Sequence, residues 1–208
     1  MQVRPKRSFV GSRQPSRPTV VPRTVGSGFA AVAVAACVGI AAVSMPARAQ
    51  PLETAASIDP ARYAGLWYEV ARLPNATQAR CVADTTSTFT LRSAHYFDVG
   101  MRCQRADGTE ESDLGIARIR NPATNAKMEI RFLPLALAWW PFAWSDYWVL
   151  DVAPDYAYAM AGSPARDTLW ILSRRRDLDP AVYERLVAKA RALGFDVGKL
   201  IRSSSATG

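Results

Sequence analysis

The sequence predicts an all-β domain, a closed barrel of about eight strands with one α-helix packed outside. Three observations lead to this prediction. Between residues 64 and 174 the chain has about eight short apolar and aromatic runs, separated by turn residues. Gly65 and Trp67 open the first run, and Arg174 ends the last. Beyond Arg174 the spacing of apolar residues changes from that of strands to that of a helix.

Gly65, Trp67 and Arg174 are predicted to form a structural plug at one end of the barrel. In a closed barrel the first and last strands are neighbours, so the Arg174 guanidinium can lie across the Trp67 indole. The opposite end is then left open for a small apolar ligand. A Gly-x-Trp motif alone carries little weight, and it is the distant arginine that favours the barrel.

The strands are expected near residues 65–73, 84–92, 95–104, 112–120, 126–133, 145–152, 156–161 and 168–174. The fifth shows the cleanest alternation, with Met128 and Ile130 on one face. Lys127, Glu129 and Arg131 fall on the other face. This pattern is typical of a strand with one apolar and one wet face.

The predicted helix begins after Asp179, a good N-cap residue, with Pro180 at the first helical position. Gly194 ends it. Its apolar stripe consists of Val182, Leu186, Ala190 and Leu193. A single helix can bury such a stripe only against the outside of the barrel. Residues 195–202 are expected to return along the barrel wall.

Residues 1–49 are predicted to be a secretory signal peptide with a long basic n-region. This leader holds seven of the 26 Lys and Arg residues and no acidic residue, leaving 19 basic and 18 acidic residues elsewhere. The pI near 9.8 is therefore a property of the leader and does not indicate nucleic acid binding. The apolar stretch 29–43 is shorter than the roughly 20 residues of a membrane span, although an uncleaved anchor is an alternative.

Two processing sites compete within the leader. Ala47-Arg48-Ala49 is an A-x-A site, which predicts cleavage after Ala49. Val34-Ala35-Ala36-Cys37 looks like a lipoprotein box, in which Cys37 would carry the lipid, but the apolar run continues past Cys37. Residues 50–57 are then a linker, 58–203 the barrel with its helix, and 204–208 a tail.

Cys81 and Cys103 are the two cysteines that remain after the leader. Period two places both on one face of neighbouring strands, on either side of the turn at 92–95. In an exported protein this pair predicts a disulfide, with two separate buried thiols as the alternative.

The chain resembles the lipocalin family, and more closely its bacterial outer-membrane branch, which includes relatives of apolipoprotein D. Residues 63–72 resemble the first lipocalin motif, 145–150 the second, 169–174 the third, and 194–200 the C-terminal segment. One departure is the segment 152–156, which replaces the Thr-Asp-Tyr-like turn usual after the second motif. That leaves the closed-end turn undefined, but not the fold.

The resemblance implies an eight-stranded antiparallel up-and-down barrel (lipocalin) with a C-terminal α-helix packed outside. It also implies binding of a small hydrophobic molecule, such as a lysophospholipid or a fatty acid, and it implies no cofactor. The leader and the family together predict a location in the periplasm, with attachment to the outer membrane as a further expectation.

If the face of Trp67 points inward, alternation gives the barrel an apolar inner wall with a few hydroxyl groups. The predicted ligand-binding residues are Glu69, Ala71, Phe89, Val99, Met128, Ile130, Tyr147, Tyr158, Met160 and Trp170. Gly115 and Ala117 are expected to face inward with them. The alternative is that these residues are ordinary core that fills the barrel.

The segment 132–144 is unusually apolar for a surface loop, and family position places it between the fifth and sixth strands at the open end. Its aromatic residues include Trp139, Trp140, Phe142 and Trp144. Tryptophan at such a boundary suits a membrane surface, and the segment could equally be a lid. A protein partner or a second copy of the chain, giving a homodimer, is the alternative.

The sequence predicts no enzyme and no metal site. Its one histidine, His95, lies at a hairpin tip, and the usual catalytic and metal-binding motifs are absent from the sequence. An enzyme built on the barrel is the alternative, and only Glu69 with the tyrosine hydroxyls could serve it. A third hypothesis is an envelope interaction protein with a filled barrel, whose tryptophan segment binds a partner.

Overall fold

The computed structural model describes residues 51–132, 139 and 143–203. The chain divides into two units, Met1–Ala47 and Arg48–Gly208, and the described residues belong to the second. The predicted signal peptide, Cys37 and the tail 204–208 lie outside the described residues. Within the described part, no helix is both long enough and apolar enough to span a membrane.

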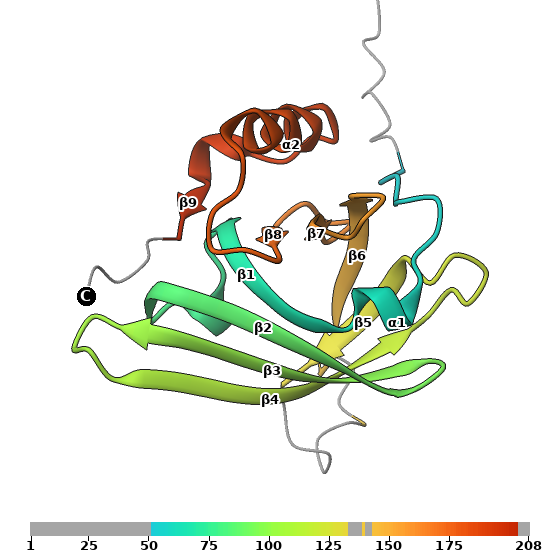
Figure 1. The fold of residues 1–208 in the computed structure, drawn as a ribbon, viewed down its shortest axis with the longest axis horizontal. Helices are drawn as coiled ribbons and strands as arrows, with labels where there is room; N and C mark the ends of the chain where they lie inside the picture. The colour runs from blue at the N-terminus through green and yellow to red at the C-terminus, as the bar shows by residue number, and fades with distance from the viewer. Residues whose placement is uncertain (1–50, 133–138, 140–142, 204–208) are drawn as a thin grey trace, which may run out of the picture. The chain divides into compact units, whose positions relative to one another are not determined.

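Eight antiparallel strands form a closed barrel, as predicted (Figure 1). They are β1 (Gly65–Arg72), β2 (Cys81–Ser93), β3 (Tyr96–Arg105), β4 (Glu110–Ile119), β5 (Lys127–Arg131), β6 (Ser145–Val152), β7 (Tyr158–Gly162) and β8 (Leu169–Ser173). Each strand pairs with the next along the chain, and β1 pairs with both β2 and β8, which closes the barrel. A short ninth strand, β9 (Ile201–Arg202), lies beside β1.

Strand β1 changes neighbour halfway along its length. Its first part, Gly65 to Tyr68, pairs with β2, whereas Ala71 and Arg72 pair with β9. On its other edge the register to β8 shifts between Glu69 and Ala71, which marks a β-bulge. The bulge changes which residues face the interior beyond Glu69, because one extra residue reverses the alternation.

Two helices begin at the same kind of signal. In α1 (Pro60–Tyr63) and α2 (Pro180–Ala192), an aspartate caps the N-terminus and a proline follows it. Asp179 accepts hydrogen bonds from the backbone N–H groups of Ala181 and Val182. Helix α2 was predicted from the sequence, whereas α1 was not. Single turns of 3-10 helix, η1 (Ala76–Gln78) and η3 (Val197–Lys199), complete the described elements.

The apolar core forms two clusters on either side of the barrel wall. One lies inside the barrel and contains Trp67, Phe89, Val99 and Tyr147. The other lies between the wall and α2, where Leu186 and Ala190 pack against Ile171 of β8. Figure 1 shows α2 outside the barrel, on the side away from β2, β3 and β4. Strands β6, β7, β8 and β1 therefore have apolar residues on both faces.

Candidate functional site

The predicted plug residues Gly65, Trp67 and Arg174 lie together at one end of the barrel. The Arg174 guanidinium carbon is 3.7 Å from the centroid of the fully buried Trp67 ring. Arg174 also donates hydrogen bonds to the backbone carbonyls of Arg62, Tyr63, Ala64 and Leu66. Gly65 has a φ of +102°, and a Cβ there would lie 3.1 Å from Arg174 Nη1, so both conformation and space favour glycine.

Helix α1 completes this closed end from the inside. Tyr63, its last residue, is fully buried, and its carbonyl accepts a hydrogen bond of 2.9 Å from the Trp67 indole N–H. The hydroxyls of Tyr63 and Tyr147 form a hydrogen bond of 2.8 Å. Burial raises the pKa of both tyrosines, so the two hydroxyls stay protonated at physiological pH.

Above this floor the barrel holds a cavity of about 420 Å³, called here the barrel cavity. This volume lies within the range of small-molecule sites. Its apolar lining comes from Phe89, Val99, Met101, Ile130, Phe132, Ala143, Tyr147, Trp170 and Leu172. Its polar lining comes from Asn75, Thr77, Gln78, Ser87, Asp113, Arg131, Ser145 and Thr168. The cavity is thus an apolar hollow with polar groups around part of it, which suits an amphiphilic ligand.

Five of the ten predicted ligand-binding residues border the barrel cavity: Phe89, Val99, Ile130, Tyr147 and Trp170. Met128 is also interior, but it is fully buried in the core cluster and does not border the cavity. Glu69 is buried beside the cavity and is held in a polar cluster described below.

Ala71, Tyr158 and Met160 were expected to face the ligand, and this was wrong. Ala71 and Met160 belong to the cluster between the barrel wall and α2, and Tyr158 packs against it. The bulge after Glu69 reverses the facing of Ala71. In β7 the small residues Ala159 and Ala161 face inward instead. Alternation could not show which face of β7 points into the barrel, because packing against α2 makes its outer face apolar as well.

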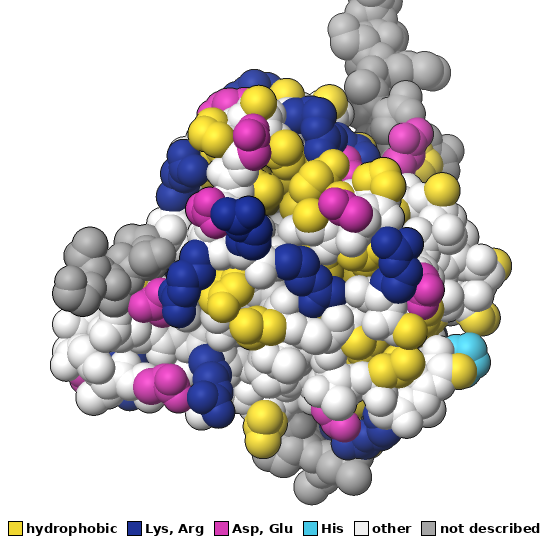
Figure 2. Space-filling model, in the orientation of Figure 1, with side chains coloured by type: hydrophobic (Ala, Val, Ile, Leu, Met, Phe, Trp, Pro, Cys, Tyr) yellow, Lys and Arg dark blue, Asp and Glu magenta, His cyan; other side chains and the backbone are white. Residues whose placement is uncertain are grey.

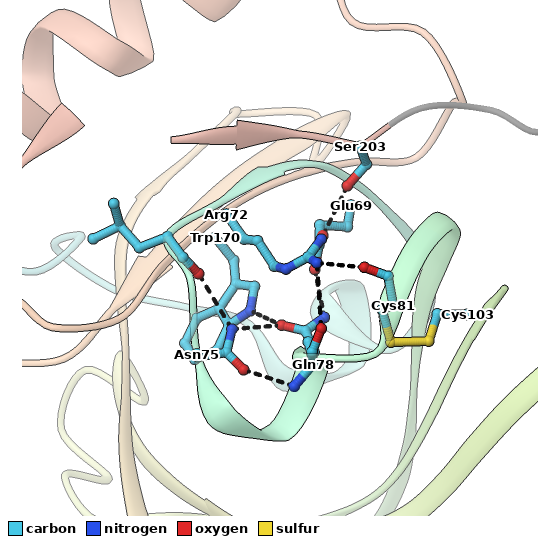
Figure 3. Close-up of polar contacts among 9 residues, drawn as sticks. Glu69, Arg72, Asn75, Gln78, Cys81, Cys103, Trp170 and Ser203 are labelled. Carbon is cyan, nitrogen blue, oxygen red and sulfur yellow. Dashed lines mark hydrogen bonds and ion pairs between the residues drawn. A yellow bond between two sulfur atoms is a disulfide. The ribbon is translucent and has the colours of Figure 1, made fainter. Parts of the chain in front are cut away.

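A set of hydrogen-bonded polar side chains, called here the rim cluster, joins the β1–β2 connection to the cavity (Figure 3). Glu69 accepts hydrogen bonds from Arg72 Nη1 at 2.7 Å, Gln78 Nε2 at 2.6 Å and Ser203 Oγ at 2.8 Å. Gln78 Oε1 in turn accepts from Asn75 Nδ2 and from the Trp170 indole N–H. The rim cluster consists of Glu69, Arg72, Asn75, Gln78, Trp170 and Ser203.

The rim residues Asn75 and Gln78, which border the cavity together with Thr77, were not predicted from the sequence. They stand in a connection between strands rather than in a strand, so alternation did not reach them. Their position could have found them, because connections at the open end of a barrel surround its mouth.

Cys81 and Cys103 form the predicted disulfide next to the rim cluster. The Cys81 carbonyl accepts a 2.8 Å hydrogen bond from Arg72 Nη2, which ties the start of β2 to the Arg72–Glu69 ion pair. Nearby, Glu111 forms ion pairs with Arg105 and Arg80. The hydrogen bond from Arg105 is the main cause that lowers the pKa of Glu111.

The tryptophan segment is described only in part. Trp139 is 74% exposed, whereas Trp144 is half-buried between Arg118 and Arg131, whose guanidinium carbons are 3.8 and 4.9 Å from its ring centroid. Trp140 and Phe142 lie outside the described residues. The two described tryptophans therefore differ in their surroundings, since Trp144 is held against β4 and β5.

Charge on the surface is mixed. Figure 2 shows Lys and Arg side chains interspersed with acidic and apolar ones on the face drawn, without one continuous basic patch. Nine of the twelve ion pairs between described residues include a side chain at least 40% exposed. Pairs of this kind add little stability, and the pattern is that of an ordinary solvated surface.

Comparisons with known proteins agree with this geometry. A family model described as "Lipocalin-like domain" matches residues 58–205. Temperature-induced lipocalin-1 of Arabidopsis thaliana is 35% identical over 151 residues, which is 72% of this chain and 80% of that protein. Outer membrane lipoprotein Blc of Escherichia coli is 30% identical over 178 residues, which is 85% of this chain and 93% of that protein.

Solved structures share the fold. Insecticyanin from the tobacco hornworm Manduca sexta superposes with a TM-score of 0.58 at 22% identity, covering 78% of this chain and 88% of that one. The family match covers nearly all of the described barrel and helix, and the plug, the closed strand order and the outer helix are all present. The chain therefore belongs to the lipocalin family.

Proposed function

We propose that the protein binds and carries one small hydrophobic molecule, a lysophospholipid or a fatty acid, in the bacterial cell envelope. The observation that carries this proposal is the barrel cavity of about 420 Å³, lined by Phe89, Val99, Ile130, Tyr147 and Trp170. An apolar hollow of this size loses water on taking up a hydrocarbon chain, which provides the driving force for binding.

The two ends of the barrel give the ligand a direction. The closed end is sealed by Trp67, Arg174 and the buried Tyr63–Tyr147 hydroxyl pair. At the other end, the connection residues Asn75, Thr77 and Gln78 supply polar groups at the cavity. An amphiphile would enter chain first and leave its head group at the polar end.

The relatives support a location in the envelope. The match to the Escherichia coli outer membrane lipoprotein covers 178 residues, more than the chain has from residue 58 onward, so it extends into the leader. Export of this chain, by cleavage after Ala49 or by lipidation of Cys37, would place it in the periplasm or on the outer membrane. The Cys81–Cys103 disulfide suits either oxidising location.

The groups that the enzyme alternative requires are already engaged. Glu69 accepts three hydrogen bonds within the rim cluster, and the Tyr147 hydroxyl is bonded to Tyr63. A general base must lie within hydrogen-bond reach of the proton that it abstracts, and Glu69 does not border the barrel cavity. The cavity likewise favours a carrier over an interaction protein with a filled barrel.

Contact with a membrane surface, or with a second copy of the chain, is proposed only through the exposed Trp139.

Ligand binding is tested with a pair of neighbouring substitutions. Ser87 borders the barrel cavity, whereas Thr86 is adjacent in sequence, points to the opposite face and borders no described cavity. Ser87→Phe should fill part of the cavity and lower the affinity for palmitate and for lysophosphatidylcholine, measured by titration calorimetry. Thr86→Phe should leave both affinities unchanged. Equal affinities for the two variants would contradict the proposed site.

A further inference from the structure

Two hollows meet at the end of β5. Besides the barrel cavity, an outer hollow of about 580 Å³ lies along the outer faces of β2, β3 and β4. Its lining includes Thr88, Thr90, Arg92, Asp98, Leu114 and Ile116. Val99, Arg131 and Phe132 border both hollows. These three residues therefore form the partition between the interior of the barrel and its outer face.

The partition lies where the regular pairing of β4 and β5 ends. Their pairing ends at Ile116 and Arg131. At the next residue of β4, a Cβ on Gly115 would lie 2.4 Å from the Arg131 carbonyl oxygen and 2.8 Å from a ring carbon of Phe132. The end of β5 thus crosses close against the β4 backbone, where only glycine leaves room. This crossing brings the Arg131 residue, expected on the wet outer face, into the partition.

Arg131 is buried there without a full set of hydrogen-bond partners. Arg131 as a whole is only 4% exposed. In the described structure neither its Nε nor its Nη1 has a hydrogen-bond acceptor. The guanidinium contacts the Trp144 ring at 4.9 Å. A buried cation with unsatisfied donors is costly, and an anion that accepts from those donors would remove the cost.

The neighbouring charges do not compensate Arg131. Asp98 in the outer hollow is paired with Arg92, and Glu129 is paired with Arg118 and Arg120. Asp113 borders the barrel cavity but is only half-buried, and among the described residues it forms no ion pair with Arg131. Water can therefore solvate Asp113, whereas Arg131 is shielded from it.

We propose that Arg131 binds the anionic head group, a carboxylate or a phosphate, of an amphiphile whose chain occupies the barrel cavity. The inference rests on the proposed carrier function and deepens it by naming the group that recognises the head. Guanidinium suits both anions, because it keeps its charge when buried and presents donors in a rigid plane. The anion supplies the acceptors that the protein lacks at Nε and Nη1.

The chemical test compares ligands that differ only in the charge of the head group. Dodecanoate and dodecanol carry the same chain, and each would displace an uncharged naphthylamine fluorophore from the purified protein at mildly alkaline pH. The native protein should bind dodecanoate about tenfold or more tightly than dodecanol, the size expected of a charge-assisted hydrogen bond. Lysophosphatidic acid and monoacylglycerol with matched chains give the phosphate version of the same comparison.

Arg131→Gln should abolish this preference, because it weakens dodecanoate binding about tenfold more than dodecanol binding. Dodecanol binding that persists also shows that the variant is folded. Arg118→Gln is the matched control, because Arg118 stacks on the same Trp144 ring but is paired with Glu129. It should keep the full preference. If Arg131→Gln does not fold, Arg131→Lys and the native comparison decide the question.

The outcomes separate the two claims. If the fluorophore and dodecanol bind but the native protein does not prefer dodecanoate, the role of Arg131 is wrong and the carrier function stands. If no lipid and no fluorophore binds, the carrier function itself fails. Excess inorganic phosphate should not displace dodecanoate. If phosphate, which has no hydrocarbon chain, does displace dodecanoate, Arg131 is a site for free anions. The head-group proposal is then overturned.

Discussion

Arg174 joins the two ends of the barrel sequence, because its guanidinium carbon lies 3.7 Å from the Trp67 ring centroid while its N–H groups bind carbonyls on both sides of Gly65. The Arg174 side chain thus stacks on a residue 107 positions earlier in the sequence and donates hydrogen bonds to the backbone beside it. Burial lowers the pKa of Arg174, yet the usual arginine pKa is so high that the group stays charged.

Arg174→Ala should lower the free energy of unfolding by about 1–3 kcal/mol, because it removes the cation–π contact and several backbone hydrogen bonds. Arg174→Lys should recover only part of this, since lysine keeps the charge without the planar fork. Arg175→Ala is the control, because its ion pair with Asp177 is exposed. Urea unfolding measures all three, and an Arg174→Ala variant as stable as Arg175→Ala would contradict the plug.

Gly115→Ala should destabilise the protein by about 1–3 kcal/mol, because its Cβ would overlap the Arg131 carbonyl oxygen and force β5 to shift. Gly100→Ala, on the adjacent strand, should be well tolerated. A Cβ there would meet only a side-chain carbon of Leu114, at 3.8 Å. Thermal unfolding of the two variants compares them directly. Equal losses would show that the crossing of β5 over Gly115 is not rigid.

Glu69→Gln should cost about 3–5 kcal/mol, because it leaves the buried Arg72 guanidinium without its counter-charge. Ser203→Ala removes a single hydrogen bond to the same carboxylate and should cost only about 1 kcal/mol. Chemical denaturation provides both values. Similar small losses would mean that the rim cluster is solvated rather than a buried ion pair.

Arg131→Met should raise the stability of the ligand-free protein by roughly 1–3 kcal/mol, since it removes a buried charge with unsatisfied donors. The same change at Arg118 should not stabilise, because Arg118 is already paired with Glu129. The measurement is calorimetric unfolding after delipidation. A strongly destabilised Arg131→Met variant would show that the charge is compensated in the empty protein.

Much of the fold could be predicted from the sequence, because alternation, turn residues and the Asp179-Pro180 cap are local signals. The facing of residues was harder. A bulge in β1 and an apolar outer face on β7 sent Ala71 and Met160 outward, and neither feature has a signature in a single strand. The signal for α1 was present in Asp59-Pro60, the same pair that begins α2.

The candidate site could be predicted only where strands supply it. Phe89, Val99 and Ile130 follow from alternation, and they border the cavity. Gln78 and Arg131 do not follow from it, because one lies in a connection and the other is carried inward where β5 leaves β4. Their roles depend on contacts between segments far apart in the sequence, which a local pattern does not contain.

The central claim is that the barrel cavity holds one amphiphilic molecule, and native mass spectrometry of the purified protein tests it most directly. With added palmitate or lysophosphatidylcholine, we expect a single adduct per chain, whose mass equals that of the lipid. The same spectrum would give the mass of the processed N-terminus and any lipid on Cys37. A protein that stays free of every lipid offered would contradict the carrier function.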